Sequence, residues 1–163
     1  MVNRVEIKDA NLRDLSYIMA HMRPGDRAEV MCQFPEGTKT YELAYGLLHT
    51  KHAYVAYLDG KPVAAFGVAE MNVVTVSVWA VGTPRMKRAV PMITRFFRDL
   101  LTPQLIKEGY RTMEARSHAV HLEAHRWMTS TGAVQADLPY IYGRNGEKFI
   151  TFRWTSDDYP TKA

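Results

Sequence analysis

One stretch, Val73–Leu101, constrains the fold of this chain more than any other. It begins with the run VVTVSVWAV (Val73–Val81), whose two alternating faces are both apolar or small. This pattern predicts a central strand that is covered on both sides. A turn, GTPRM, and an amphipathic helix, KRAVPMITRFFRDLL, follow directly. The free N–H groups at the start of such a helix, beside a basic turn, favour the binding of a phosphate or pyrophosphate.

Three short helices are expected before residue 52. Asn11 with Asp14, and Asp26 with Glu29, have the spacing of N-capping pairs, in which a side chain satisfies free N–H groups of the first turn. A threonine, at position 38 or 40, is expected to cap the third helix. Each of the three helices carries apolar residues at helical spacing, so each is expected to pack one face against the core.

The remaining segments alternate between strands and helices. Asp59-Gly60, between two apolar runs, is a strong signal for a two-residue hairpin turn. The order of elements predicts a single three-layer α/β domain, residues 1–155, with a mixed, mostly antiparallel sheet of about six to seven strands and helices on both faces. Residues 156–163 are expected to form a frayed tail. The expected strands are Val5–Lys8, Ala53–Leu58, Pro62–Ala69, Val73–Val81, Thr112–Ser117, Ala133–Tyr142 and Lys148–Trp154.

The composition argues against several classes of function. The net charge of +4 over 163 residues comes from scattered basic residues, so no specific nucleic-acid partner is expected. No run of about 18 apolar residues is present, which predicts no membrane span. The first residues, MVNRVEIKDANLRD, carry charges where a signal peptide needs an apolar run. Cys32 is the single cysteine, so an internal disulfide is impossible and a reducing compartment is expected.

Two segments, taken with the order of the elements, carry a resemblance to a known superfamily. One is the strand Val73–Val81 with the turn and helix after it. The other, HLEAHRWMTSTGA (His121–Ala133), is similar to the pattern Asn-x-x-Ala-x-x-aromatic/Leu-Tyr-x-x-x-Gly-Phe and matches it at Ala124, Trp127 and Gly132. Both resemble the GNAT acyltransferase superfamily, in which the fourth strand and the next helix hold the pyrophosphate of an acyl-CoA. The resemblance implies an N-acyltransferase that transfers an acetyl group from acetyl-CoA to an amine.

Five blocks of sequence carry a narrower resemblance over almost the whole chain. They are MRPGDRAEV (22–30), DGKPVAAFGVA (59–69), WAVGT (79–83), HRWMTSTGA (125–133) and GRNGEKFITF (143–152). In this order they resemble the internal virion protein A family of short-tailed bacteriophages, which is GNAT-like and whose members are often described as acetyltransferases. This resemblance implies a phage-encoded protein in the host cytoplasm or packaged in the virion, with a virion or host protein as a partner.

The resemblance implies an acyl-CoA site at the strand–turn–helix, although the loop departs from the superfamily's pattern. That pattern is [Gln/Arg]-x-x-Gly-x-[Gly/Ala], and the register that starts at Arg85 places Arg88 and Val90 at its two small positions. Side chains there would crowd a pyrophosphate that approaches the backbone. A second register puts Gly82 at the turn, and the basic residues still supply charge for phosphates. The implied residues for acetyl-CoA are Trp79, Ala80, Val81, Gly82, Arg85, Lys87 and Arg88.

The catalytic acid and base of the superfamily have no direct counterpart in this chain. Met128 stands where the superfamily has its tyrosine, and methionine cannot donate a proton. The strand Val73–Val81 contains no carboxylate. Other residues could take these roles, but each candidate carboxylate could equally be a surface residue and each candidate tyrosine a ring packed in the sheet. The expected catalytic residues are Glu70 and His118 as bases and Tyr140 as acid, with Glu114, His121 and Tyr142 as alternatives.

Two further interpretations remain open. His121 and His125 share a helix face, but no other ligands accompany them, so no metal is expected and an exposed helix face is the alternative. The missing glycines and tyrosine favour a catalytically silent protein of the same fold that acts through protein contacts, in the virion or on a host protein. The strand–turn–helix and its basic turn favour the acetyltransferase.

Overall fold

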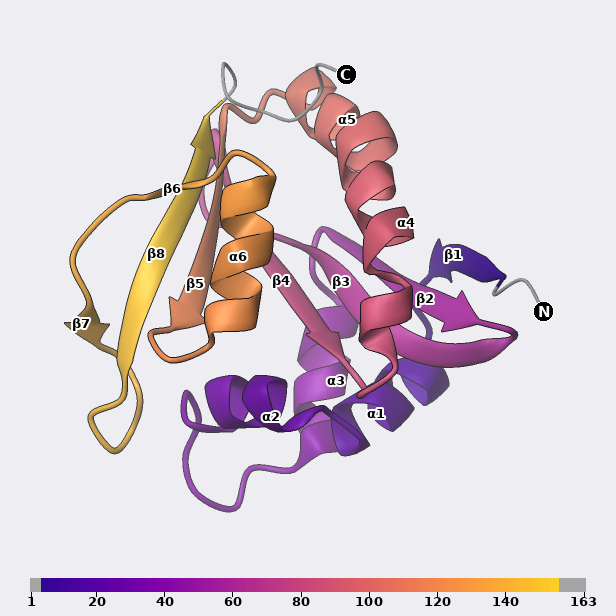
Figure 1. Cartoon of the computed structure of the whole chain (residues 1–163), viewed down its shortest axis with the longest axis horizontal. Coiled ribbons are helices and arrows are strands. Elements are labelled where there is room, and N and C mark those ends of the chain that lie inside the picture. Colours follow the sequence, from indigo (N-terminus) through magenta and orange to yellow (C-terminus); the bar gives the residue numbers. More distant parts are fainter. Residues whose placement is uncertain (1–3, 156–163) are drawn as a thin grey trace.

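The computed structural model describes residues 4–155, and the tail expected at 156–163 lies outside this range. Its centre is a mixed sheet with the strand order β1-β2-β3-β4-β5-β8-β6, in which β7 also pairs with β8 (Figure 1). Every pair is antiparallel except β4 with β5, which is parallel. The strands are β1 (Val5–Asp9), β2 (His52–Leu58), β3 (Lys61–Glu70), β4 (Thr75–Gly82), β5 (Thr112–His118), β6 (Val134–Gln135), β7 (Tyr140–Ile141) and β8 (Lys148–Thr155).

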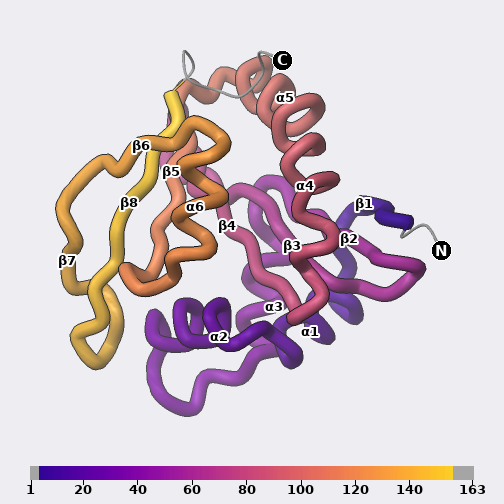
Figure 2. The backbone as a smooth tube through the Cα atoms, in the orientation of Figure 1, coloured from indigo at the N-terminus to yellow at the C-terminus, as the bar shows by residue number. Residues whose placement is uncertain are grey.

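Helices cover both faces of the sheet, as the sequence predicts. On one face α1 and α3 pack against β2, β3 and β4 around Leu15, Ile18 and Ala44. On the other face the long helical segment after β4 packs with α6 around Phe66, Phe97 and other apolar residues. Figure 2 shows α2 below the sheet, beneath the gap between β4 and β5. The helices are α1 (Leu12–Ala20), α2 (Pro24–Met31), α3 (Thr40–Leu48), α4 (Val90–Phe96), α5 (Thr102–Lys107) and α6 (Leu122–Ser130).

Several local predictions are confirmed. The side chain of Asn11 accepts a hydrogen bond from the N–H of Asp14 at 2.9 Å and so caps α1. Asp59 and Gly60 both have positive φ, 51° and 83°, as the tight β2–β3 hairpin requires. The helical segment after β4 stops before Gly109, whose φ is 103°. It contains a π turn at Phe97–Leu101, which ends two residues before Pro103, whose ring nitrogen has no N–H to donate.

Other local predictions are wrong. The segment Ala133–Tyr142 forms two short strands instead of one, because Pro139 lies between them and cannot donate to a ladder. The sheet therefore has eight strands. β4 begins at Thr75, since the side chain of Asn72 accepts a hydrogen bond from the N–H of Val74 and turns the chain there.

The helix starts after α1 also differ from the predictions. α2 begins at Pro24 with Arg23 at its N-cap, so Asp26 does not cap it. Proline suits this first position because its fixed φ is helical and its missing N–H leaves no donor unpaired. α3 begins at Thr40, and Lys39 occupies its N-cap. Over residues 4–155, no helix is both long and apolar enough to cross a membrane.

Candidate functional site

The strands β4 and β5 separate along their length and form a wedge. They pair only over Thr75–Ser77 and Thr112–Glu114, and beyond these residues they diverge (Figure 1). We refer to the paired part as the closed end of the wedge and to the diverging part, Val78–Gly82 opposite Ala115–His118, as the open end. Backbone hydrogen bonds hold the closed end, so any binding between the two strands has to take place at the open end.

The register of β4 turns some of its backbone groups into the open end. In an antiparallel pair, every second residue directs its N–H and C=O at the partner strand. The N–H of Thr83 donates to the carbonyl of Val63 at 2.9 Å, so Thr83 faces β3. Gly82, Ala80 and Val78 therefore face the side of β5. Because the pairing with β5 has ended, this edge of β4 presents backbone donors and acceptors to whatever enters the wedge.

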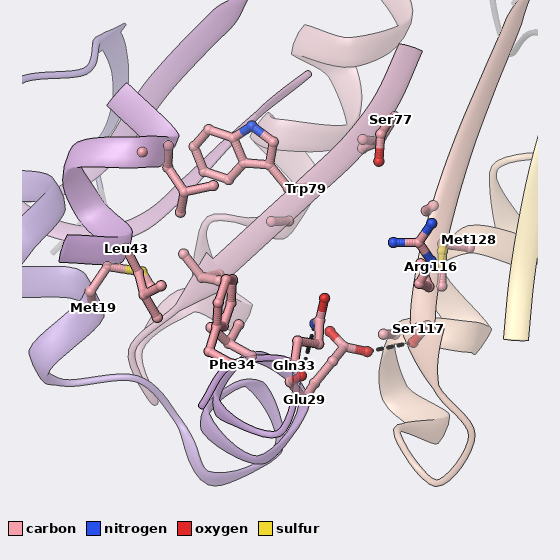
Figure 3. Close-up of a pocket in the computed structure, with 18 of the residues that line it drawn as sticks. Met19, Glu29, Gln33, Phe34, Leu43, Ser77, Trp79, Arg116, Ser117 and Met128 are labelled. Carbon is pink, nitrogen blue, oxygen red and sulfur yellow. Dashed lines mark hydrogen bonds between the residues drawn. The ribbon is translucent and has the colours of Figure 1, made fainter. Parts of the chain in front are cut away.

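Two cavities meet at the open end, one on each side of the sheet. The larger, of about 440 Å³, lies between the helices α1 to α3 and the open end, and Figure 3 shows its walls. The smaller, of about 120 Å³, lies toward α4 and α6. Both are lined by Glu29, Ala80, Ala124 and Trp127. Shared lining residues on β4, α2 and α6 place the two cavities next to each other at the open end.

Tryptophans form much of the cavity wall. The indole N–H of Trp79 donates to the hydroxyl of Thr50 at 3.1 Å, and that of Trp127 donates to Thr94 at 2.8 Å. A side chain at Gly67 on β3 would lie only 2.8 Å from the Trp79 ring and 2.0 Å from a β2 carbonyl oxygen. The glycine thus lets the ring of Trp79 lie close against the sheet, where it faces the larger cavity.

The helix α2 bridges the two diverging strands through its carboxylates. Asp26 accepts a hydrogen bond from the N–H of Gly82 at 2.8 Å, at the end of β4. Glu29, one helical turn later, accepts from the hydroxyl of Ser117 at 2.8 Å and from the N–H of His118 at 2.6 Å, at the end of β5. The two acidic residues that the sequence suggested as a capping pair therefore hold the open end at a fixed width.

A buried histidine lies between these two carboxylates. His121, at the N-cap of α6, has its Nε2 3.4 Å from Asp26 and its Nδ1 3.5 Å from Glu29. The facing Glu29 and Asp26 raise the pKa of His121, against the effect of its burial. The ring lies close over Gly25, where a β-carbon would be 3.1 Å from Nε2. The expectation that His121 belongs to an exposed helix face is wrong, because α2 covers it.

Arg23 completes the charge pattern. Its Nε donates to Asp26 at 2.8 Å, and its Nη1 donates to Glu123 at 3.3 Å. Burial raises the pKa of the Asp26 carboxyl, while Arg23 and the N–H of Gly82 act in the opposite direction. Arg23 and His121, whose pKa is raised, therefore alternate with two buried or half-buried carboxylates across the wedge, in the order Arg23, Asp26, His121, Glu29.

The other end of α2 is also fixed. The turn between β7 and β8 places Arg144 against it: the N–H of Arg144 donates to the carbonyl of Cys32 at 2.7 Å, and its guanidinium donates to the carbonyls of Met31 and Phe34, each at 2.8 Å. A cation at this position suits the carbonyl end of a helix. Cys32 itself is buried, and this burial raises the pKa of its thiol.

The basic turn after β4 borders the smaller cavity. Arg85, Lys87 and Arg88 are exposed, and none of them forms an ion pair with a carboxylate of residues 4–155. Met86, between Arg85 and Lys87, and Val90, two residues after Arg88, line that cavity. Gly82 is needed at this turn because the side chain of Met86 covers it, with Sδ 2.3 Å from the place of a β-carbon.

The structure separates the expected catalytic residues from one another. Glu70 lies at the closed end, opposite Val76, and accepts a short hydrogen bond from the hydroxyl of Tyr110. His118 ends β5, and its ring stacks on Phe149. Tyr140 lies on β7, where its hydroxyl contacts that of Thr151 at 2.7 Å. None of the three expected residues lines either cavity. Trp79, Ala80 and Val81, expected to hold acetyl-CoA, do line the larger one.

The alternatives for acid and base are placed as follows. Glu114 pairs with Arg153 of β8 at 2.7 Å, on the sheet surface. The hydroxyl of Tyr142 accepts a hydrogen bond from Arg116 at 2.6 Å. Met128 is buried and lines the larger cavity. Among the carboxylates of residues 4–155, Glu29 is the one that lines both cavities. Its spacing from Asp26 was visible in the sequence, but that spacing is equally typical of a helix cap.

The fold has clear counterparts among solved structures. A protein described as a candidate acetyltransferase superposes with a TM-score of 0.75 at 10% identity, covering 98% of this chain and 87% of its own. The yncA protein of Salmonella typhimurium, described in the same way and solved with its cofactor acetyl-CoA, gives 0.71 at 12% identity over 95% of each chain. The ribosomal-protein-S18-alanine N-acetyltransferase of Escherichia coli gives 0.68 at 16% identity, covering 93% of this chain and 94% of that one.

The sequence itself has no such counterpart, since no protein-family model and no curated protein matches it. At identities of 10% to 16%, the structural likeness is a likeness of fold. It confirms the expected three-layer α/β architecture with a mixed, mostly antiparallel sheet and helices on both faces. The chain therefore has the GNAT fold, and the narrower resemblance to a phage family stays a prediction.

Proposed function

We propose that this protein is an acyl-CoA-dependent N-acyltransferase that moves an acetyl group from acetyl-CoA to an amine. The observation that carries the proposal is the pair of cavities that meet through the open end of the β4–β5 wedge. An acyl-CoA ends in a narrow arm that carries amides and a thioester. Such an arm suits a gap between two strands, where the free backbone edge of Val78 and Ala80 can pair with its amides.

The residues present fit such a ligand in part. Ala80 and Ala124 are small and leave room where the two cavities meet. The exposed cations Arg85, Lys87 and Arg88 stand beside the smaller cavity and would hold the phosphates. The fit is poorer at the end of β4, because the N–H of Gly82 already donates to Asp26. The phosphates are therefore assigned to side chains of the turn and not to the backbone of Gly82.

In this proposal the chain supplies position and charge. The larger cavity, on the side of α1 to α3, receives the amine, and the smaller one receives the phosphate-bearing part of the donor. The indole of Trp79 keeps the reacting region apolar, which excludes water from a hydrolysis-prone thioester. Glu70, His118 and Tyr140 remain proposed acid–base residues. Their places outside both cavities give these assignments no support from geometry.

Isothermal titration calorimetry with acetyl-CoA tests the proposal. Binding with a dissociation constant in the micromolar range, together with release of free thiol when an amine is added, is the expected result. No heat and no rise in melting temperature at millimolar acetyl-CoA would reject it, since a ligand that binds the native state must stabilise it.

A second candidate function has its own observation. The network on α2 already occupies the N–H and the carbonyl of Gly82, the latter through the N–H of Arg23 at 2.8 Å. A wedge whose last β4 backbone groups already have partners within the protein also suits a catalytically silent GNAT-fold protein that acts through protein contacts. The resemblance to the phage family implies that such a silent protein would be phage-encoded and would act in the host cytoplasm or in the virion. Mass spectrometry of purified virions tests the virion role, and absence from the particles would exclude it.

A further inference from the structure

The larger cavity combines an apolar wall with one carboxylate oxygen that its neighbours leave unused. Glu29 lies at the floor of the cavity with its side chain 13% exposed. Its contacts with Ser117, His118 and His121 within residues 4–155 are all made by the same oxygen, Oε1. Figure 3 shows one carboxylate oxygen turned to Ser117 and the other directed away from it. The second oxygen, Oε2, is therefore held in place by the bonds of the first.

A carboxylate oxygen beside apolar side chains favours a cationic donor. Ionised groups taken out of water are costly unless they are paired, and a charge-assisted hydrogen bond is stronger than a neutral one. The wall around Glu29 is formed largely by side chains such as Phe34, Leu43, Trp79 and Trp127. A ligand that matches both features has an ammonium group at one end and an aromatic or branched apolar body at the other.

We propose that this cavity is a binding site for a primary ammonium with an apolar body, and that Glu29 Oε2 receives the ammonium group. As a statement about the acetyl acceptor, this rests on the proposed function, whereas the binding itself does not. A volume of about 440 Å³ is within the range of small-molecule sites and accommodates an arylalkylamine with space to spare.

The same contact gives Glu29 a role in acetyl transfer. An ammonium has no lone pair, so it first loses one proton to Glu29 Oε2 and becomes a neutral amine. The amine nitrogen then attacks the thioester carbonyl carbon, and a carbon–nitrogen bond forms as the carbon–sulfur bond breaks. The sulfur leaves with a second proton from the same nitrogen, as a free thiol. Glu29 then releases its proton to water. Atoms and charge balance, and no further reactant is needed.

Phenethylammonium and its neutral counterpart 2-phenylethanol are suitable probes, because they share the apolar body and differ in charge. Calorimetry on the full chain at pH 7 is expected to show that the wild type prefers the ammonium. Glu29→Gln is expected to lose at least about tenfold in ammonium affinity and to leave the alcohol within about twofold. The glutamine oxygen can still accept from Ser117 and His118, so this variant is expected to keep α2 in place.

Two control variants separate charge from structure. Glu42→Gln neutralises the other carboxylate of the same cavity wall and is expected to keep the preference for ammonium. Ser117→Ala removes one hydrogen bond to Glu29 without changing its charge, and it is expected to keep the preference too. Loss of the preference in Ser117→Ala as large as that in Glu29→Gln would mean that a displaced helix, and not the lost charge, causes the effect, and would overturn the assignment.

The outcomes separate this inference from the proposed function. Equal affinity of the wild type for the ammonium and the alcohol, no binding of either probe, or an unchanged preference in Glu29→Gln overturns the ammonium site. Each of these results leaves a positive acetyl-CoA titration intact. Selective ammonium binding that depends on Glu29, in a protein that gives no heat with acetyl-CoA, supports the site and rejects the acetyltransferase.

Discussion

The two ends of the β4–β5 wedge are held together by different means. At the closed end, Thr75–Ser77 and Thr112–Glu114 form a regular parallel ladder, and Glu70 bonds to Tyr110 beside it. At the open end there is no ladder, and α2 connects Gly82 to Ser117 through two carboxylates. Backbone pairing makes the first end rigid and closed to ligands, whereas side-chain bonds hold the second end apart and leave room between the strands.

This difference decides which acidic residues can contact a ligand in the cavities. Glu70 is next to β4 in sequence, yet its position at the closed end keeps it out of both cavities. Glu29 is distant in sequence and reaches both cavities, since α2 crosses the open end. Four experiments test this difference between the two ends, in order of decreasing expected effect.

The largest effect is expected from filling the connection between the cavities. Ala80→Phe places a large ring where both cavities meet and is expected to weaken acetyl-CoA binding by about 100-fold or more. Calorimetry measures the affinity. The matched control is Ala136→Phe, the same change at an exposed position outside both cavities, which is expected to bind normally. Normal binding by Ala80→Phe would show that acetyl-CoA does not pass between the strands.

Removing a charge from the bridge is expected to destabilise the fold. Asp26→Asn leaves Arg23 and His121 without their shared carboxylate, and the free energy of unfolding is expected to fall by about 2–3 kcal/mol, because a buried ion pair loses one partner. Urea unfolding measures the change. Glu70→Gln at the closed end is the comparison, and it is expected to cost less than about 1 kcal/mol because the ladder remains. Equal losses would contradict the difference between the two ends.

The basic turn is expected to contribute a smaller, phosphate-dependent share of binding. The double variant Arg85→Ala and Arg88→Ala is expected to weaken acetyl-CoA binding by about 5- to 30-fold, since two exposed cations are lost from the phosphates. Pantetheine, which has no phosphates, serves as the control ligand, and its affinity is expected to stay the same. A similar loss for both ligands, or no loss for acetyl-CoA, would reject this placement of the phosphates.

The smallest effect depends on pH. Glu29 and Asp26 raise the pKa of His121 in the folded protein, so folding is favoured while the imidazole is protonated. This contribution is complete below the ordinary histidine pKa of about 6.5 and is lost as the pH rises through the higher folded value. His121→Asn is therefore expected to cost at least about 1 kcal/mol at pH 6 and clearly less at pH 9. Urea unfolding at both pH values measures this, and a cost that grows with pH would have the wrong sign.

Much of the fold could be predicted because its signals are local. Asp59-Gly60 fixes a hairpin through backbone conformation alone, and Asn11 caps a helix three residues away. The pattern Val73–Val81 identified the central strand because burial on both faces leaves a run without polar alternation. The errors lie where a local signal is ambiguous, as at Pro139, which divides one expected strand into two.

The candidate site was harder to predict because its contacts are distant in sequence. Asp26 bonds to Gly82, and Glu29 bonds to Ser117, across 56 and 88 residues. Their spacing of three residues is the same whether they cap a helix or bridge two strands, so the sequence cannot distinguish the two. Gly82 shows the same limit. In the structure it makes room for the side chain of Met86, but in the sequence it is only a glycine in a turn.

In the proposed function, the open end of the wedge is a passage between the two cavities. A crystal structure of the protein with acetyl-CoA tests it most directly. We predict that the arm of the ligand lies between β4 and β5, paired with the backbone of Val78 and Ala80, with its thioester in the larger cavity near Glu29. An arm that lies outside the wedge, with α2 still bridging Gly82 and Ser117, would contradict this prediction.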